Sequence, residues 1–157
     1  MHSLSQKALL ELESQGMRGL ILDLRSNLGG LLSSAIEITD KFINEGLIVS
    51  TRPRSWLSAS YAHAKKKNTH PDYPLVLLTN RFSASASEIV AGSLGDKSHE
   101  RAVLVGERTH GKGRVQGILS YGAGGAQLKY TMAYYHLPSG QRVESQDAMK
   151  KLGKEDW

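Results

Sequence analysis

The stretch LVLLTNRFSASASEIVAGSL, residues 75–94, decides the fold of this chain. Its first five residues form an apolar run that is typical of a buried strand, and its last ten carry the apolar spacing of a helix. A strand that leads through a short turn into a helix is the building unit of α/β proteins. The stretch therefore predicts a strand, a serine-rich turn and a helix, with the turn at one end of a sheet.

Similar patterns extend this unit in both directions. Helices are predicted for residues 5–15 and 31–45, and strands for residues 20–23, 47–49 and 102–105. Strands that alternate with helices imply right-handed crossovers and a largely parallel sheet.

Two further segments do not follow this alternation. Residues 52–73 are polar and lack a clear period, which predicts a loop or a loose hairpin. Residues 127–134 alternate between polar and apolar side chains, which is typical of a half-buried strand. The sequence therefore predicts an α/β fold in a single domain over residues 1–157. It has a mostly parallel sheet, flanking helices and additional β structure towards the C-terminus.

Composition excludes several classes of protein. Hydrophobic residues make up 39% and charged residues 22% of the chain, as in globular proteins, and no run approaches the roughly 18 apolar residues of a membrane span. The absence of cysteine excludes disulfides, thiolate metal sites and a cysteine nucleophile. The net charge of +5 permits nucleic-acid binding. However, the one dense basic cluster, residues 65–67, is typical of a solvated loop, so no nucleic-acid partner is predicted.

Three loops follow predicted strands, at residues 23–30, 79–87 and 106–113. Ligands of parallel sheets bind beyond the carboxyl ends of the strands, which makes these loops the candidate site. In the second loop, Ser85 precedes a helix whose first N–H groups are free to stabilise an oxyanion. The alternative is helix capping, because Ser85 and Glu88 have the spacing of a capping box.

The third loop holds Lys112 between two glycines. A lysine that is buried on such a turn loses its proton more readily, because desolvation lowers its pKa, and it then serves as a general base. The alternative is a solvated lysine in a flexible turn. The spacing also approaches a phosphate-binding loop, but Gly113 stands where that motif needs Ser or Thr. Residues 114–119 predict an extended segment instead of the helix that should follow, so an NTPase is not expected.

Taken together, three motifs resemble one family. They are DLRSNLGG at 23–30, NRFSASASEI at 80–89 and GERTHGKG at 106–113. Their order and sequence resemble the carboxyl-terminal processing peptidases, or tail-specific proteases, which are serine peptidases of family S41 with a serine–lysine dyad. The resemblance covers about residues 5–140 and implies a crotonase-like peptidase core.

The resemblance also implies roles for individual residues. Ser85, which is followed by Ala-x-Glu, corresponds to the nucleophile, and Lys112 to the general base. The amide of Ala86 and an amide of Gly29 or Gly30 correspond to the oxyanion hole.

Two more residues bear on the general base. Gln116, four residues beyond the lysine, corresponds to the glutamine that holds the lysine in place. The residue types alone also allow a Ser85–His110–Asp96 triad, but the position of Lys112 fits the family and that of His110 does not. The six scattered histidines show no repeated ligand spacing, so neither a metal nor another cofactor is predicted.

For the whole protein, the resemblance implies a serine endopeptidase that cleaves proteins near their C-termini through an acyl-enzyme intermediate. It implies protein or peptide substrates and is compatible with a homo-oligomer. It also implies a PDZ domain in the full-length chain, because the family usually has one and no part of this sequence resembles it. The family also implies a periplasmic or cell-envelope location, although this chain shows no signal peptide. The alternative function is a non-catalytic peptide-binding module that adds an extended peptide to an exposed strand edge.

Overall fold

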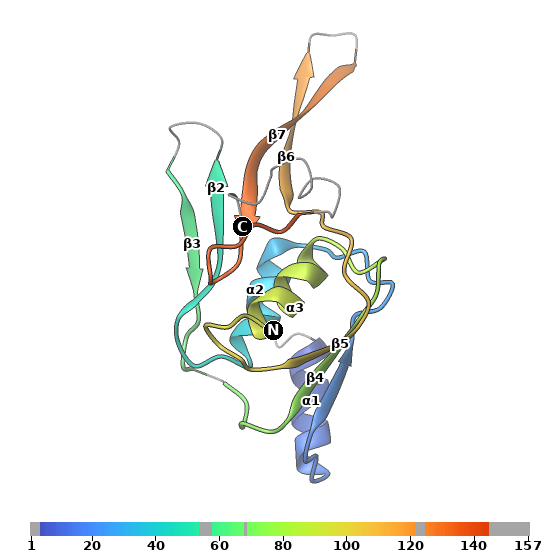
Figure 1. Cartoon of the computed structure of the whole chain (residues 1–157), viewed down its shortest axis with the longest axis vertical. Helices are drawn as coiled ribbons and strands as arrows, with labels where there is room; N and C mark the ends of the chain where they lie inside the picture. Colours follow the sequence, from blue (N-terminus) through green and yellow to red (C-terminus); the bar gives the residue numbers. More distant parts are fainter. Residues whose placement is uncertain (1–3, 54–57, 68, 122–124, 145–157) are drawn as a thin grey trace.

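The computed structural model describes residues 4–53, 58–67, 69–121 and 125–144. These residues form helices and strands that gather into two sheets (Figure 1). The elements are α1 (Leu4–Ser14), β1 (Leu20–Asp23), α2 (Leu32–Asp40), β2 (Leu47–Pro53), β3 (Ser60–His63), β4 (Leu75–Thr79), α3 (Ala86–Leu94), β5 (Val103–Gly106), β6 (Arg114–Tyr121) and β7 (Ala126–His136).

The first sheet is parallel and has the strand order β1-β4-β5. In its central strand, β4, the side chains of Leu75 and Leu77 are buried, as the apolar run predicts. Because all three strands run in the same direction, the loops that follow them leave from the same edge of the sheet. This arrangement confirms the predicted α/β fold and the gathering of the three candidate loops at one end.

The second sheet is antiparallel and has the strand order β3-β2-β7-β6. Strand β2 was expected from the alternation of strands and helices, but it lies in this sheet and not in the parallel one. Its residue Ser50 pairs with Tyr61 of β3 on one side and with His136 of β7 on the other. The segment over residues 52–73 therefore contains the returning strand of a hairpin, while residues 54–57 and 68 lie outside the described part.

Helix α2 is shorter than the sequence predicts, since it ends at Asp40 and not at residue 45. The backbone N–H of His70 donates a hydrogen bond to the carbonyl of Lys41 at 2.7 Å, so this carbonyl is not available to extend the helix. Phe42 and Ile43 are nevertheless buried, from the turn that follows the helix.

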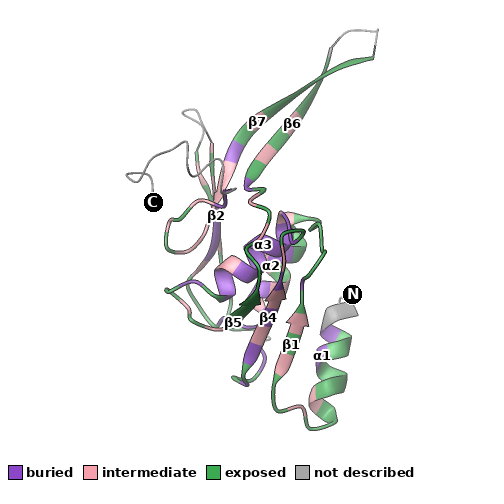
Figure 2. Cartoon of the chain, turned by 45° about the vertical axis from the view of Figure 1, so that its right-hand side comes forward, coloured by how far each residue is buried: buried purple, intermediate pink, exposed green. Residues whose placement is uncertain are grey.

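The core lies between α2, α3 and one face of the parallel sheet (Figures 1 and 2). Ile48, Leu77, Ile89 and Leu94 are almost completely buried in it. Helix α1 lies alongside β1 in both views. Strand β5, at the other edge of the parallel sheet, is exposed along its whole length.

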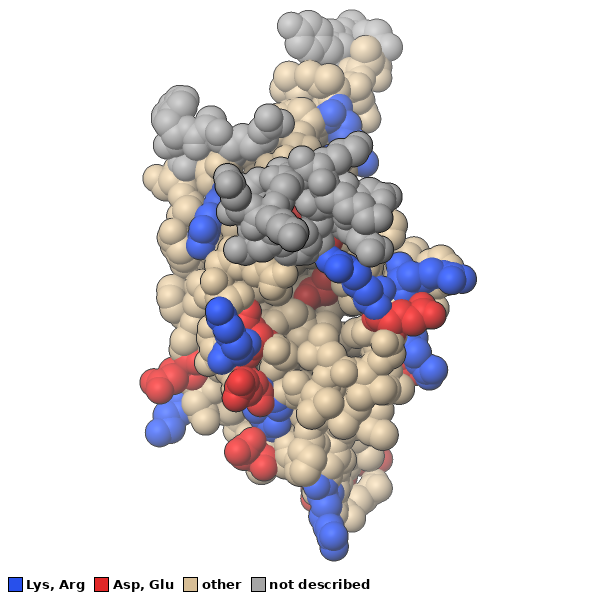
Figure 3. Space-filling view, viewed as in Figure 1, with Lys and Arg blue, Asp and Glu red and all other residues tan. Residues whose placement is uncertain are grey.

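The β6–β7 hairpin projects away from this core, and most of its outer half is exposed (Figure 2). Acidic and basic side chains lie interspersed on the face drawn in Figure 3. None of the helices in the described ranges is both long and apolar enough to cross a membrane.

Candidate active site

Ser85 lies at a sharp turn between β4 and α3. Its backbone angles are φ 56° and ψ −116°, and the residue is half-buried. A positive φ costs a residue with a side chain about 1–2 kcal/mol, so the surrounding structure must hold this turn in place. A serine on a strained strand-to-helix turn that presents its hydroxyl is the arrangement of a nucleophile elbow.

The amide that begins α3 completes the local geometry. Ala86 is the first residue of the helix and is buried. Its N–H donates no hydrogen bond within the described part of the chain, as is usual for the first turn of a helix. An unpaired N–H directly after a serine hydroxyl is a suitable donor to an oxyanion.

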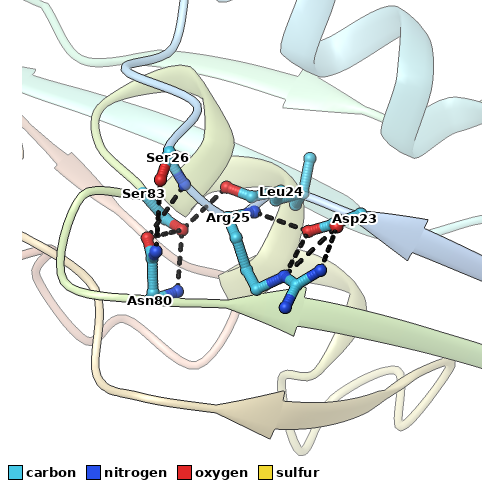
Figure 4. Close-up of polar contacts among 6 residues, drawn as sticks. All are labelled: Asp23, Leu24, Arg25, Ser26, Asn80 and Ser83. Atoms are coloured by element: carbon cyan, nitrogen blue, oxygen red, sulfur yellow. Dashed lines mark hydrogen bonds and ion pairs between the residues drawn. The ribbon is translucent and has the colours of Figure 1, made fainter.

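A buried polar network joins the first loop to the second (Figure 4). The hydroxyl of Ser83, which is fully buried, donates to the carbonyl of Leu24 at 2.8 Å and accepts the N–H of Asn80 at 3.0 Å. The side-chain carbonyl of Asn80 accepts the N–H of Ser26 at 2.9 Å. Sequence reasoning gave Ser83 and Asn80 no role, although their nearness to the proposed nucleophile was the available signal.

The first loop also carries an exposed ion pair between Asp23 and Arg25. The Arg25 guanidinium contacts the carboxylate at 2.7 Å, and the Arg25 N–H donates to the same carboxylate at 2.9 Å. Through its hydrogen bonds with the Arg25 side chain and backbone, the pKa of Asp23 falls to about 2. The carboxylate thus stays ionised and fixes the shape of the turn that leads to Gly29.

The third loop lies against the second. The N–H of Glu107 donates to the carbonyl of Thr79 at 3.0 Å, and the N–H of His110 donates to the carbonyl of Ser83 at 2.9 Å. Gly106 allows this approach: a Cβ there would lie 2.2 Å from the Thr79 oxygen, and its φ is +121°.

Lys112 and Ser85 are brought together through their backbones. The N–H of Lys112 donates to Glu88 Oε2 at 2.8 Å, and the N–H of Ser85 donates to the same oxygen at 2.7 Å. The Lys112 residue is exposed, in contrast to the buried lysine that a general base at this turn was expected to need. Among the described residues no hydrogen bond joins Ser85 Oγ to Lys112 Nζ.

Gln116 lies in β6, where it is exposed and pairs with Thr131 of β7. No hydrogen bond between its side chain and Lys112 is recorded in the described part of the structure. Gln116 thus lies four residues beyond the candidate base, in the strand that follows the third loop.

The alternative triad of Ser85, His110 and Asp96 is not assembled. Asp96 follows the C-terminal end of α3, whereas Ser85 precedes its N-terminal end, and a helix of nine residues is about 13 Å long. The Asp96 carboxylate accepts the N–H groups of Ser98 at 2.9 Å and Ser139 at 3.1 Å. Although burial alone raises the pKa of Asp96, these hydrogen bonds bring it below its ordinary value. The Asp96 carboxylate is therefore bonded to backbone N–H groups beyond the far end of α3 and not to His110.

The two glycines of the first loop differ in their surroundings. A Cβ on Gly29 would lie 2.5 Å from the Ala84 carbonyl and 2.7 Å from the Ala86 nitrogen, and its φ is +93°. The Gly29 N–H donates to the side chain of Asn27 at 2.9 Å. At Gly30 nothing lies within 4 Å of an added Cβ, and its N–H has no partner among the described residues.

This difference gives a matched pair of substitutions. Gly29→Ala should lower the free energy of unfolding by at least about 2 kcal/mol, because the methyl group overlaps the Ser85 turn and the backbone is strained. Gly30→Ala should change it by less than about 1 kcal/mol, since the space is open. Urea unfolding of both variants measures the difference. Equal stability losses would contradict the close packing of Gly29 against the elbow.

No group of three or more His, Cys, Asp or Glu side chains that could hold a metal ion occurs in the described part of the chain. The arrangement offers a serine hydroxyl, a lysine in the adjoining loop and backbone N–H donors.

Known proteins resemble this chain over most of its length. The sequence model of peptidase family S41 matches residues 2–150. The chain is 44% identical over 143 residues to a carboxy-terminal-processing protease of Bartonella bacilliformis, a match that covers 88% of this chain and 32% of that protein. It is 45% identical over 131 residues to a carboxyl-terminal-processing protease of Synechocystis sp., covering 83% of this chain and 30% of that protein.

Among solved structures, the photosystem II D1 C-terminal processing protease superposes with a TM-score of 0.76 at 34% identity. That match covers 90% of this chain and 37% of the other. The chain thus spans about a third of the length of the curated relatives that it matches.

Proposed function

Because the chain belongs to peptidase family S41, we propose that it carries the catalytic serine and lysine of a peptidase that cleaves proteins near their C-termini. The observation that carries this proposal is the common carboxylate of Glu88, to which the backbones of Ser85 and Lys112 are both hydrogen-bonded. It keeps the candidate nucleophile and the candidate base in neighbouring loops at the carboxyl edge of the parallel sheet.

In the proposed reaction, neutral Lys112 Nζ accepts the proton of the Ser85 hydroxyl as Oγ attacks the carbonyl carbon of the peptide. The tetrahedral oxyanion accepts hydrogen bonds from the N–H groups of Ala86 and Gly30. These two amides are the better pair, because both lack partners among the described residues while the Gly29 amide is bonded to Asn27.

When the C–N bond breaks, protonated Lys112 returns its proton to the leaving amine, and the acyl group remains on Ser85. Water then attacks the ester carbonyl while Lys112 accepts its proton, and as the C–Oγ bond breaks Lys112 returns this proton to Ser85 Oγ, which releases the acid product and restores the site. Gln116 is proposed to hold the lysine once substrate fills the site. Protein substrates are a further proposal, which the names of the relatives support. A PDZ domain elsewhere in the protein, a homo-oligomer and a periplasmic or cell-envelope location are proposals that rest on the family resemblance alone.

A fluorophosphonate probe tests this function on the chain itself, because it phosphonylates activated serine hydroxyls. We expect one adduct per chain, mapped to Ser85 by peptide mass spectrometry. If an extended peptide binds while no serine is labelled, the non-catalytic peptide-binding module is the correct function. Labelling at Ser83 or Ser87 instead of Ser85 would contradict the assignment of the nucleophile.

A further inference from the structure

Glu88 has more hydrogen-bond partners than a helix cap requires. A capping box needs its acidic residue to accept one N–H, that of the N-cap residue, which here is Ser85. The Glu88 carboxylate also accepts the N–H of Gly111 on Oε1 and the N–H of Lys112 on Oε2, at 2.8 Å for the second bond. Two of its three donors therefore belong to a loop that lies more than 20 residues further along the chain.

The carboxylate is also buried, with only 3% of the Glu88 residue exposed. Burial of an ionised carboxylate is costly unless hydrogen bonds compensate for the lost water. Here three backbone N–H groups supply that compensation. Removing the carboxylate leaves the amides of three residues unpaired at once, and two of these residues are the proposed nucleophile and base.

We propose that Glu88 is a positioning residue that sets the distance between Ser85 and Lys112, in addition to capping α3. The inference rests on the proposed function of this dyad. Glu88 lies one helical turn beyond Ser85, so its side chain returns to the elbow, where it also contacts the glycine–lysine turn. No hydrogen bond joins the two reacting side chains within the described residues, whereas the backbones of Ser85 and Lys112 are both bonded to one oxygen of Glu88, which fixes where these backbones lie relative to each other.

Hydrogen exchange on the intact chain tests the connection without relying on activity. In Glu88→Gln, which keeps the shape but only one acceptor oxygen, the amides of Gly111 and Lys112 should exchange about tenfold faster than in the unaltered chain. Ser93→Ala is the matched control. It removes a buried hydrogen bond of 2.7 Å from α3 to the Ile48 carbonyl but does not touch the third loop. If Glu88 only caps the helix, Glu88→Gln should speed amide exchange in the first turn of α3 and leave the exchange rates of the Gly111 and Lys112 amides unchanged. That result would overturn the proposal.

Labelling kinetics test the consequence. Glu88→Gln and the shorter Glu88→Asp should both lower the maximal rate of fluorophosphonate labelling, by about 10²-fold for a displacement near 1 Å, while the apparent dissociation constant of the probe stays the same. Ser93→Ala should retain the maximal rate even where it lowers stability. A Glu88→Gln variant that labels at the original rate would refute the positioning role. If the unaltered chain does not label at all, the proposed reaction fails, and the exchange experiment still decides whether Glu88 joins the two loops.

Discussion

Ser85→Ala should abolish fluorophosphonate labelling and any peptide cleavage, with a loss of at least about 10⁴-fold, because it removes the proposed nucleophile. The free energy of unfolding should change by less than about 1 kcal/mol, because alanine retains the backbone and the same positive φ. Intact-mass measurement of the labelled fraction over time, together with urea unfolding, measures both quantities.

The neighbouring serines provide the controls. Ser87→Ala should leave most of the labelling rate, because Ser87 is a buried residue in the first turn of α3, beyond the elbow. Ser83→Ala should also retain the nucleophile but lower the free energy of unfolding by about 1–3 kcal/mol, since it leaves the buried Leu24 carbonyl and Asn80 N–H without a partner. If Ser87→Ala removes labelling in a folded protein, then Ser85 is not the nucleophile.

The strand, turn and helix of residues 75–94 could be predicted because their signals are local. The apolar run, the serine-rich turn and the helical spacing are each contained in a short stretch of consecutive residues, so each can be recognised without knowing the rest of the fold. The position of the three loops also followed, since strands joined by helices run parallel and their carboxyl ends meet at one edge.

The partners of β2 could not be predicted in the same way. Its segment over residues 47–49 has the composition of any buried strand, and nothing local distinguishes a parallel partner from an antiparallel one. The pairing with β7 joins residues that are 80 or more positions apart, and it depends on how both hairpins fold over α2 and α3.

Within the candidate site, residue types were easier to predict than connections. Ser85 and Lys112 were identified from motifs, and Glu88 was recognised as a helix cap. That the same carboxylate also binds the third loop depends on a contact across 24 residues, which no local spacing encodes. The exposure of Lys112 could not be predicted either, because burial of a loop side chain depends on what packs over it.

Lys112→Arg should be as inactive toward the probe as Lys112→Ala, although it keeps the positive charge. A general base must be neutral to accept the Ser85 proton, and an arginine side chain does not release its proton in proteins. Lys97→Arg, the same substitution at an exposed lysine beyond the far end of α3, should label at the original rate. His110→Ala should also label normally, because the Asp96 that a histidine base would need is bonded to Ser98 and Ser139.

The pH dependence follows from the same requirement. Only the unprotonated form of a general base accepts a proton, and its share grows as the pH rises. The labelling rate should therefore increase from neutral towards alkaline conditions, by up to about tenfold per pH unit. Labelling rates of the chain and of Lys112→Arg across this pH range decide the matter: a rise of the same slope in both proteins would show that another group accepts the proton.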